Sequence, residues 1–289
     1  TILDKNICYI YIPKELIMLK KWFVLIVFLI SNFVAFSQVQ TEIAPPYNIK
    51  TVSFVQNNQN IVPIFRLGDS FQLQFDDLFG NEANYYYTIV HCNYDWKQSD
   101  LAQAEYISGF DNQRIQDYTN SFNTLQLYSH YRLSFPNKFT NFLVTGNYML
   151  NILNEDREIV FSRKFILYQE MVQVPMQVKR ARNVKDIDFK HNLDFAIKSK
   201  DLTFQSPLTN VKVMLMQNGQ FNTAITNIKP MYTIGNDLIY KYDKETQFWA
   251  GNEYLFFENK DVRAATNNVG KIETSGSVYN TYLYPNYAR

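Results

Sequence analysis

The sequence predicts an all-β protein with two tandem antiparallel β-sandwich domains, at residues 38–170 and 171–289, after a signal peptide. Three observations support this fold class. Tyr and Phe occur 21 and 23 times in 289 residues, and aromatic residues favour strands. Apolar and polar residues alternate over short segments that turn-forming residues separate. No long helical periodicity follows residue 37.

Residues 18–37 have the pattern of a secretory signal peptide, and residues 1–17 are expected to be upstream read-through. A short positive region ends at Lys21, the apolar run Trp22 to Ile30 follows, and Ala35 and Ser37 are small residues placed for cleavage after Ser37. A transmembrane anchor is the alternative. The apolar run is shorter than the roughly 20 residues that span a bilayer, so a signal peptide is the better interpretation.

Cleavage after Ser37 leaves a nearly neutral chain with one cysteine. It removes four of 28 basic and two of 27 acidic residues, which leaves 24 and 25. This balance gives no electrostatic reason to expect nucleic acid or an anionic membrane as partner. No later apolar run is long enough to span a membrane. Cys92 remains alone, so no intramolecular disulfide can form, and we expect a small buried residue and not a reactive thiol.

The run from Tyr85 to Trp96 is the densest strand signal after the leader. With a two-residue period, one face carries Tyr85, Tyr87, Ile89 and His91, and the other carries Tyr86, Thr88, Val90 and Cys92. Bulky residues on both faces predict a central strand. Turn-forming residues follow, and Trp96 is placed to fold back over the core.

Other segments of the first domain also alternate. In the clearest of them, Phe71, Leu73 and Phe75 alternate with glutamines, which is typical of a half-buried strand. A few helix-compatible residues lie at 100–105. The polar turn 56–60 and the turn 154–156 each separate two expected strands. The expected strands around the central one are residues 49–55, 61–66, 71–75, 148–152 and 159–167.

Residues 125–135 predict a strand that contains a candidate tyrosine corner. Leu125 is followed six residues later by Tyr131, the spacing of the tyrosine corner in immunoglobulin-like and fibronectin III-like sandwiches. There the ring packs inward and the hydroxyl bonds to upstream backbone. Tyr131, Leu133 and Phe135 are then expected to face the core. An ordinary amphipathic strand is the alternative.

The second domain begins near Met171 after almost no linker. Alternating residues predict strands at 193–197 and 211–215, and further strands are expected at 238–242, 254–258 and 278–284. Asn218-Gly219 is the strongest tight-hairpin signal, because both central residues of a type I′ turn need positive φ.

The sequence contains no motif for catalysis or for binding a cofactor or a metal. We therefore expect a protein that is not an enzyme and that has no cofactor and no metal site. His91, His130 and His191 lie on separate expected strands without ligands at metal-site spacing. Asp76-Asp77, and Asp95 with Asp100, are the acidic groups near the central strand, and turn or capping roles suit them better than a carboxylate pair for glycoside hydrolysis. Nucleophile elbows, Gly-rich phosphate loops and paired-cysteine motifs are absent from the sequence.

Several blocks of the sequence nevertheless resemble a known family. The longest are 85–96, 106–114, 120–125, 130–137, 179–182 and 240–263, which include Tyr-Tyr-Tyr-Thr-Ile-Val-His-Cys-Asn-Tyr-Asp-Trp and Phe-Trp-Ala-Gly-Asn-Glu. Together they resemble the plug protein of the type IX secretion system of Bacteroidota, over nearly the whole mature chain. Family members continue past the position of Arg289, which leaves open whether the docking surface is complete in these residues.

The resemblance implies a periplasmic protein that docks on the outer-membrane β-barrel translocon and closes its periplasmic opening. Such a role needs neither catalysis nor a small-molecule substrate. From residue chemistry, the expected partner contacts are Trp96, Phe248, Trp249 and Arg263, because aromatic and Arg side chains dominate binding hot spots. A secreted carbohydrate-binding module is the alternative from another class, and a hydrolase that uses the Asp pairs is the third.

Overall fold

The computed structural model describes residues 39–251 and 256–285. The expected signal peptide lies outside these residues. The chain divides into two compact units, the first ending at Gln169 and the second beginning at Glu170. Regular structure is almost entirely strand, which confirms the all-β class. The described helices are short, namely α2 (Gln103–Tyr106), α3 (Pro207–Asn210) and the 3-10 helix η1 (Phe221–Thr223).

None of the helices in residues 39–251 and 256–285 has the length and apolar character needed to cross a membrane.

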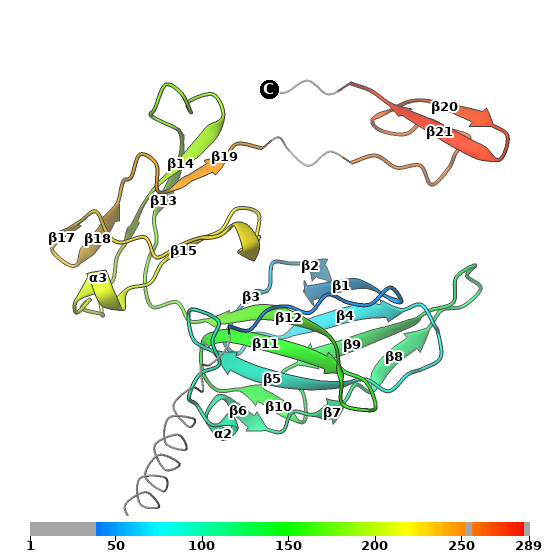
Figure 1. Ribbon diagram of the computed structural model, residues 1–289, viewed down its shortest axis with the longest axis horizontal. Helices are drawn as coiled ribbons and strands as arrows, with labels where there is room; N and C mark the ends of the chain where they lie inside the picture. Colours follow the sequence, from blue (N-terminus) through cyan, green and yellow to red (C-terminus); the bar gives the residue numbers. More distant parts are fainter. Residues whose placement is uncertain (1–38, 252–255, 286–289) are drawn as a thin grey trace, which may run out of the picture. The chain divides into compact units, whose positions relative to one another are not determined.

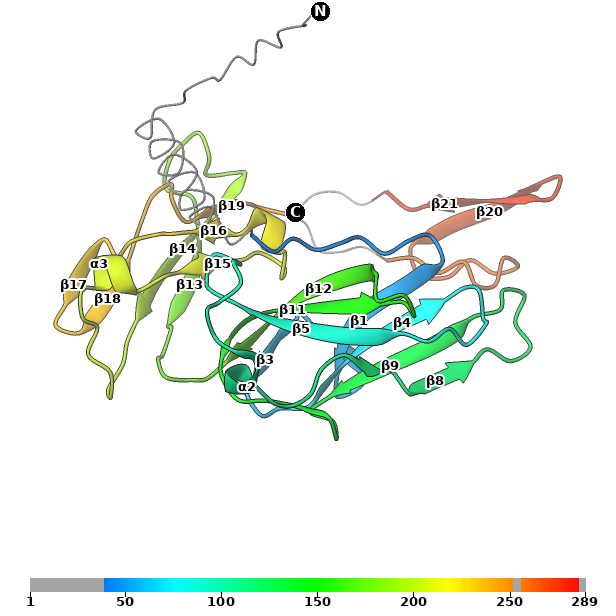
Figure 2. The same cartoon turned by 60° about the horizontal axis from the view of Figure 1, so that its bottom comes forward.

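The first unit contains two five-stranded sheets that face each other (Figures 1 and 2). The first has the order β2-β1-β4-β9-β8, with β1 Ile49–Gln56, β2 Gln59–Asn60, β4 Phe71–Asp77, β8 Asp117–Asn120 and β9 Ser129–Phe135. The second has the order β3-β12-β11-β5-β7, with β3 Ile64–Arg66, β5 Tyr86–Cys92, β7 Gln113–Arg114, β11 Gly146–Leu153 and β12 Ile159–Tyr168. A separate ribbon joins β6 Ile107–Gly109 to β10 Thr140–Phe142.

One aromatic core joins the two sheets of the first unit. Phe71 of β4 stacks on Phe65 of β3 with ring centroids 3.9 Å apart, and Phe75 of β4 meets Phe161 of β12 edge to face at 5.2 Å. The alternation predicted for β4 is confirmed, since its odd-numbered residues are buried and its even-numbered residues are half-buried. An edge-to-face pair such as Phe75–Phe161 adds about 0.5–1.5 kcal/mol beyond the burial of its area. Because such contacts join residues of both sheets, the unit is a rigid two-layer body.

The strand predicted within residues 85–96 is β5, and it lies between the long strand β11 and the two-residue strand β7. It pairs along its full length with β11, but β7 covers only Tyr86 and Tyr87 on its other edge. The face of Tyr87, Ile89 and His91 is buried as predicted. The opposite face is half-buried until Cys92, which is 1% exposed.

The strand predicted at residues 125–135 is wrong in its first part. β9 begins only at Ser129, and Leu125 and Leu127 belong to an exposed loop. From Ser129 onward the predicted alternation is confirmed. The Tyr131 hydroxyl donates to the carbonyl oxygen of Ala83 at 2.8 Å, so it ties β9 to the β4–β5 loop and not to backbone just upstream.

The short-range bond expected of a tyrosine corner occurs at another tyrosine. The Tyr148 hydroxyl donates to the carbonyl oxygen of Val144, four residues upstream, at 2.7 Å. Its ring is fully buried and stacks on Phe165 at 5.2 Å. Tyr131 therefore has the buried ring and the hydroxyl bond to upstream backbone that were expected, but its acceptor is 48 residues away, and the bond to backbone only a few residues upstream is made by Tyr148.

The second unit has one sheet with a ribbon against it. The sheet has the order β13-β14-β18-β17, and β19 also pairs with β14. Its strands are β13 Met176–Arg180, β14 Lys190–Ile197, β17 Tyr232–Ile234, β18 Asp237–Tyr240 and β19 Gln247–Trp249. The ribbon consists of β15 Met214–Leu215 and β16 Ile225–Thr226. Buried Val213 beside the ribbon shares a core cluster with Phe195 and Tyr240 of the sheet, so the second layer of the expected sandwich is only this ribbon.

Two turn predictions had opposite outcomes. Asn57 and Asn58, inside the polar turn 56–60, have φ of 51° and 61° and form the two-residue loop between β1 and β2. Asn218 and Gly219 also have positive φ, 53° and 70°, but the strands on either side do not pair immediately, and the loop runs from residue 216 to 224. The tight hairpin predicted there is wrong, because few residues of 211–215 form a strand.

The end of the described chain is a two-stranded hairpin, β20 Val269–Ser275 and β21 Val278–Leu283. It contains the strand expected at 278–284. The strand expected at 254–258 is not present in its described part, since Phe256, Phe257 and Glu258 have no regular structure, and Tyr254 lies outside the described residues.

Candidate partner-binding surfaces

One end of the first unit carries a group of exposed apolar side chains, here called the tip patch. Its members are Tyr47, Phe79, Phe122, Leu125 and Leu127, which are 72%, 54%, 92%, 110% and 60% exposed. The β8–β9 loop and the β4–β5 loop lie at this same end in both ribbon views (Figures 1 and 2). Large apolar side chains gathered on a surface mark interaction sites more often than single scattered ones do.

Contacts link the segments that carry the tip patch. The rings of Tyr47 and Phe79 meet edge to face at 5.7 Å. The Gln126 side-chain amide donates to the carbonyl oxygen of Leu78 at 3.0 Å. The base of the β8–β9 loop is closed by Ser121 and Tyr128, whose backbone N–H and carbonyl bond at 2.8 Å. The apolar side chains therefore project from loops that are held in place.

A buried carboxylate anchors two of these segments. Asp77 is 0% exposed at the end of β4. It accepts hydrogen bonds from the Asn48 side chain at 2.8 Å, the Phe79 backbone N–H at 3.1 Å and the Tyr85 hydroxyl at 2.9 Å. Because Asn48 follows Tyr47, this acceptor positions both rings of the Tyr47–Phe79 pair. The acidic group of Asp76-Asp77 thus has the structural role expected from sequence.

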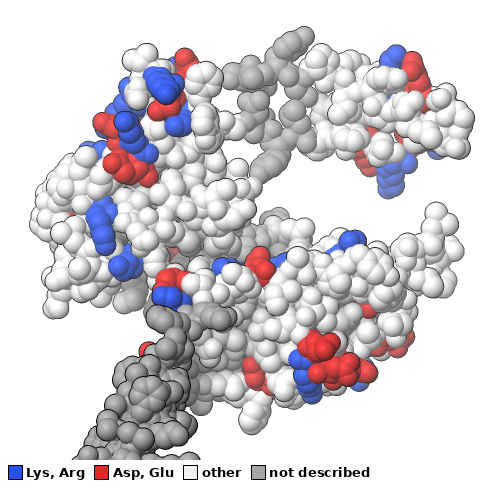
Figure 3. Space-filling view, in the orientation of Figure 1, with Lys and Arg blue, Asp and Glu red and all other residues white. Residues whose placement is uncertain are grey.

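The tip patch has little charge. No Asp, Glu, Lys or Arg occurs between Tyr118 and Ser129, and the projection at this end of the first unit is uncoloured in Figure 3. Glu82 borders it and accepts a hydrogen bond from the Tyr118 hydroxyl at 2.9 Å. The sequence does not reveal this surface, because the alternation of Leu125, Gln126 and Leu127 is typical of a strand. The signal that marks it is an uncharged run with apolar residues among Asn, Ser and Thr.

The four residues predicted as partner contacts lie in separate places, and they stay predictions. Trp96 is in the first unit, half-buried, with the Lys164 ammonium 4.3 Å from its ring centroid. Phe248 and Trp249 are neighbours on β19. Arg263 is exposed and makes a two-pronged ion pair with Asp261 at 2.9 and 3.0 Å.

Of the aromatic pair on β19, one ring packs inward and one points out. Phe248 is half-buried against the core cluster of the second unit. Trp249 is 68% exposed, and the two residues line a groove with the β15–β16 loop. Trp249 is therefore the member of the predicted set whose ring is most available to a ligand.

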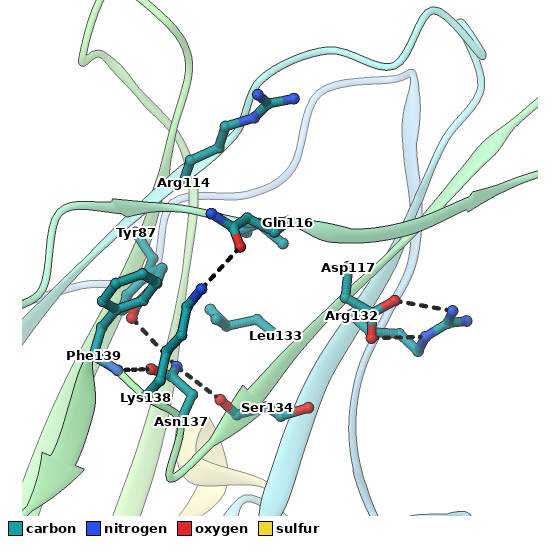
Figure 4. A pocket seen from close by; sticks show the side chains of 11 residues that line it. Tyr87, Arg114, Gln116, Asp117, Arg132, Leu133, Ser134, Asn137, Lys138 and Phe139 are labelled. Atoms are coloured by element: carbon teal, nitrogen blue, oxygen red, sulfur yellow. Dashed lines mark hydrogen bonds and ion pairs between the residues drawn. The ribbon is translucent and has the colours of Figure 1, made fainter.

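The first unit has a small cavity beside β9, shown in Figure 4. Its volume is about 150 Å³, below the roughly 300–1,000 Å³ of small-molecule sites. Most of its polar side chains bind one another: Asn137 donates to the Tyr87 hydroxyl at 3.3 Å, Lys138 donates to Gln116 at 3.4 Å, and Arg132 pairs with Asp117 at 3.1 Å. Arg114 extends away from them (Figure 4). These bonds fix the loop after β9 and leave little room for a ligand.

The histidines do not converge. Nδ1 of His91 is 2.7 Å from the Ser99 hydroxyl, and burial lowers the pKa of this histidine. Nδ1 of His130 is 2.6 Å from an Asp76 carboxylate oxygen, and His191 lies on β14. Within residues 39–251 and 256–285, no three His, Cys, Asp or Glu side chains are placed to hold a metal ion. Free Cys92 is buried, and burial raises the pKa of its thiol to about 11.

Comparison with known proteins follows the domain division. Residues 49–169 match the family described as type 9 secretion system plug protein 1st domain. No curated protein matches the chain. A crystal structure of a hypothetical protein from Parabacteroides merdae is similar, with a TM-score of 0.74 and 31% sequence identity. The match covers 85% of this chain, so it reaches into the second unit.

The same match covers 64% of the P. merdae protein, so this chain spans less than two thirds of its length. The family match at residues 49–169 covers almost the whole of the described first unit and supports a role in type 9 secretion. It also agrees with the resemblance seen in the sequence blocks around β5 and β9. Over residues 49–169, the chain is similar to the first domain of type 9 secretion system plug proteins.

Proposed function

We propose that this protein is a non-enzymatic periplasmic plug. It docks on the outer-membrane β-barrel translocon of the type IX secretion system and closes the periplasmic opening of that barrel. The family match at residues 49–169 carries this proposal. The signal peptide expected at residues 18–37 is consistent with export to the periplasm.

The first unit has the physical properties that such a role requires. A plug acts by occupying space, so it needs a body that keeps its shape and a surface that fits its partner. The shared aromatic core makes the two sheets one rigid body. The tip patch supplies exposed apolar side chains, whose burial against a partner is favourable. We therefore assign the tip patch as the main contact with the translocon.

The proposal is tested by affinity capture. Tagged residues 38–289 are incubated with a detergent extract of Bacteroidota outer membranes, and captured proteins are identified by mass spectrometry. The expected result is recovery of a very large β-barrel translocon subunit. Capture of other proteins without that subunit, from an extract in which the barrel is shown to be present and folded, would contradict the proposal.

A matched pair of variants tests the assigned surface. Phe122→Ser with Leu125→Ser removes two nearly fully exposed apolar side chains, and each is worth about 1.5–3 kcal/mol if the partner buries it. The double variant should bind the barrel at least about a hundredfold more weakly. Phe110→Ser is the control, because Phe110 is 71% exposed but lies outside the tip patch. Equal binding by both variants would remove the tip patch from the proposal.

A further inference from the structure

The second unit contains an open groove that is separate from the tip patch. Its volume is about 400 Å³, within the roughly 300–1,000 Å³ of small-molecule sites. Strand β19 forms one wall and the β15–β16 loop forms the other. Its lining includes Gln217, Gln220, Thr223, Gln247, Phe248 and Trp249. All of them lie within residues 186–249, so the groove belongs to one unit.

Trp249 presents a flat apolar surface in this groove, and its position is fixed. Its backbone is paired to Lys190 of β14, and its carbonyl oxygen accepts a hydrogen bond from the Gln217 side-chain amide at 2.9 Å. The Lys190 ammonium lies 4.9 Å from the ring centroid. The side chain is still 68% exposed. An exposed indole on a fixed backbone is a ready stacking surface with little conformational entropy left to lose.

In each of the three glutamine side chains, either the amide oxygen or the NH₂ group is hydrogen-bonded, and the other is available to a ligand. Gln217 and Gln247 donate to the carbonyl oxygens of Trp249 and Asp243, so their own amide oxygens remain as acceptors. Gln220 accepts from the Thr223 hydroxyl at 3.5 Å, so its NH₂ group remains as a donor. In the part of the chain that the structure describes, these remaining groups have no partner. The groove thus offers both donors and acceptors, which a ligand rich in hydroxyl groups needs.

The groove has little net charge. Lys190 pairs with Asp186 at 3.0 Å, which neutralises both. Among the described residues, Lys244 has no carboxylate within ion-pair distance, so it leaves a single positive charge at the rim. A site for phosphate groups or a metal ion would concentrate charge of one sign. This site instead combines an aromatic face, neutral amides and one cation.

From this combination we infer that the groove binds an oligosaccharide. One pyranose ring stacks its C–H face on the Trp249 indole, and the hydroxyl groups of that ring and its neighbour bond to the amides of Gln217, Gln220 and Gln247. Lys244 accommodates a neutral sugar or one that carries a single carboxylate. This inference goes beyond the plug role and does not depend on it. It also departs from the expectation that the protein has no small-molecule ligand.

The inference is tested with soluble tetrasaccharides and tryptophan fluorescence. Residues 38–289 contain only Trp96 and Trp249, so in a Trp96→Phe background the signal comes from Trp249. Chitotetraose, cellotetraose and maltotetraose separate amino-sugar ligands from neutral glucans. We expect saturable fluorescence change with at least one of them at millimolar concentration, and isothermal titration calorimetry with otherwise unmodified protein should give the same affinity.

Substitutions then locate the site. Trp249→Ala should weaken binding at least about tenfold, and Gln217→Ala and Gln220→Ala should each weaken it several-fold. Tyr282→Ala is the control, since Tyr282 is an exposed aromatic residue on β21, outside the groove. Circular dichroism confirms that each variant is folded. Absence of saturable binding to all three sugars, binding that Trp249→Ala leaves unchanged, or binding only of peptides would overturn the inference.

Discussion

Replacing Asp77 with Ala should destabilise the first unit by about 3 kcal/mol or more. The change removes the acceptor of three hydrogen bonds at the base of the tip patch, from Asn48, the Phe79 backbone and Tyr85. Hydrogen bonds to a charged group contribute about 1.5–3 kcal/mol each. The donors of Asn48 and Tyr85 are buried with Asp77, so they lose their partner without gaining water. Removal of a buried carboxylate that has no cation beside it offsets part of this cost.

Asp77→Asn is the matched control because it keeps the size of the side chain. Its amide oxygen still accepts from Asn48 and Phe79, and its NH₂ group donates to the Tyr85 hydroxyl. The expected loss is about 1 kcal/mol, since the bonds remain but lose their charge. The comparison separates the effect of the bonds from the effect of the charge.

The assay is urea unfolding of residues 38–289 in a Trp249→Phe background, where fluorescence reports on Trp96 and therefore on the first unit. With a urea m-value of about 2 kcal/mol/M, a loss of about 3 kcal/mol moves the midpoint by about 1.5 M. Asp77→Asn should move it by about 0.5 M. A shift for Asp77→Ala no larger than that of Asp77→Asn would refute the reasoning, since it would mean that the three bonds add no net stability.

Three further outcomes are expected. Gly146→Ala should destabilise the first unit by about 2–4 kcal/mol, measured by urea unfolding, because Gly146 has positive φ and the added Cβ would clash with the buried His91 ring. Gly68→Ala is the control: Gly68 also has positive φ but faces open space, so the change should cost about 1 kcal/mol. Burial lowers the pKa of His91 in the folded protein. As the pH drops below about 6.5, His91 is therefore protonated in the unfolded chain before it is protonated in the folded chain, and the free energy of unfolding should fall. His91→Asn should make that fall smaller. Cys92, with its pKa raised to about 11, should react with a thiol reagent at pH 7 only after unfolding, and fast labelling of the native protein would contradict its burial.

The strand pattern of the first unit could be predicted because burial repeats every second residue. Phe71, Leu73 and Phe75 are inside as expected, and so are Tyr131, Leu133 and Phe135. The loop around Leu125 shows the limit of this reasoning. Its alternation is that of a strand, but its apolar side chains have no core to enter, and only the three-dimensional structure shows that they face water.

The second unit was less predictable because its strands are short and its loops are long. A single residue pair such as Asn218-Gly219 fixes local φ but does not bring two strands into register. The predicted contact residues show a similar limit. Sequence chemistry selected Phe248 and Trp249 as equals, but Phe248 is half-buried against the core while Trp249 stays largely exposed, although both line the groove. The three glutamines beside Trp249 come partly from the β15–β16 loop, so no sequence spacing joins them.

The most direct test of the central claim is the conductance of the purified translocon barrel in a planar lipid bilayer, before and after addition of residues 38–289 to the periplasmic side. The account predicts that the protein lowers the conductance in a saturable way. The Phe122→Ser, Leu125→Ser double variant should need at least about a hundredfold more protein for the same effect. A wild-type protein that binds the barrel and leaves its conductance unchanged would contradict the claim that it closes the opening.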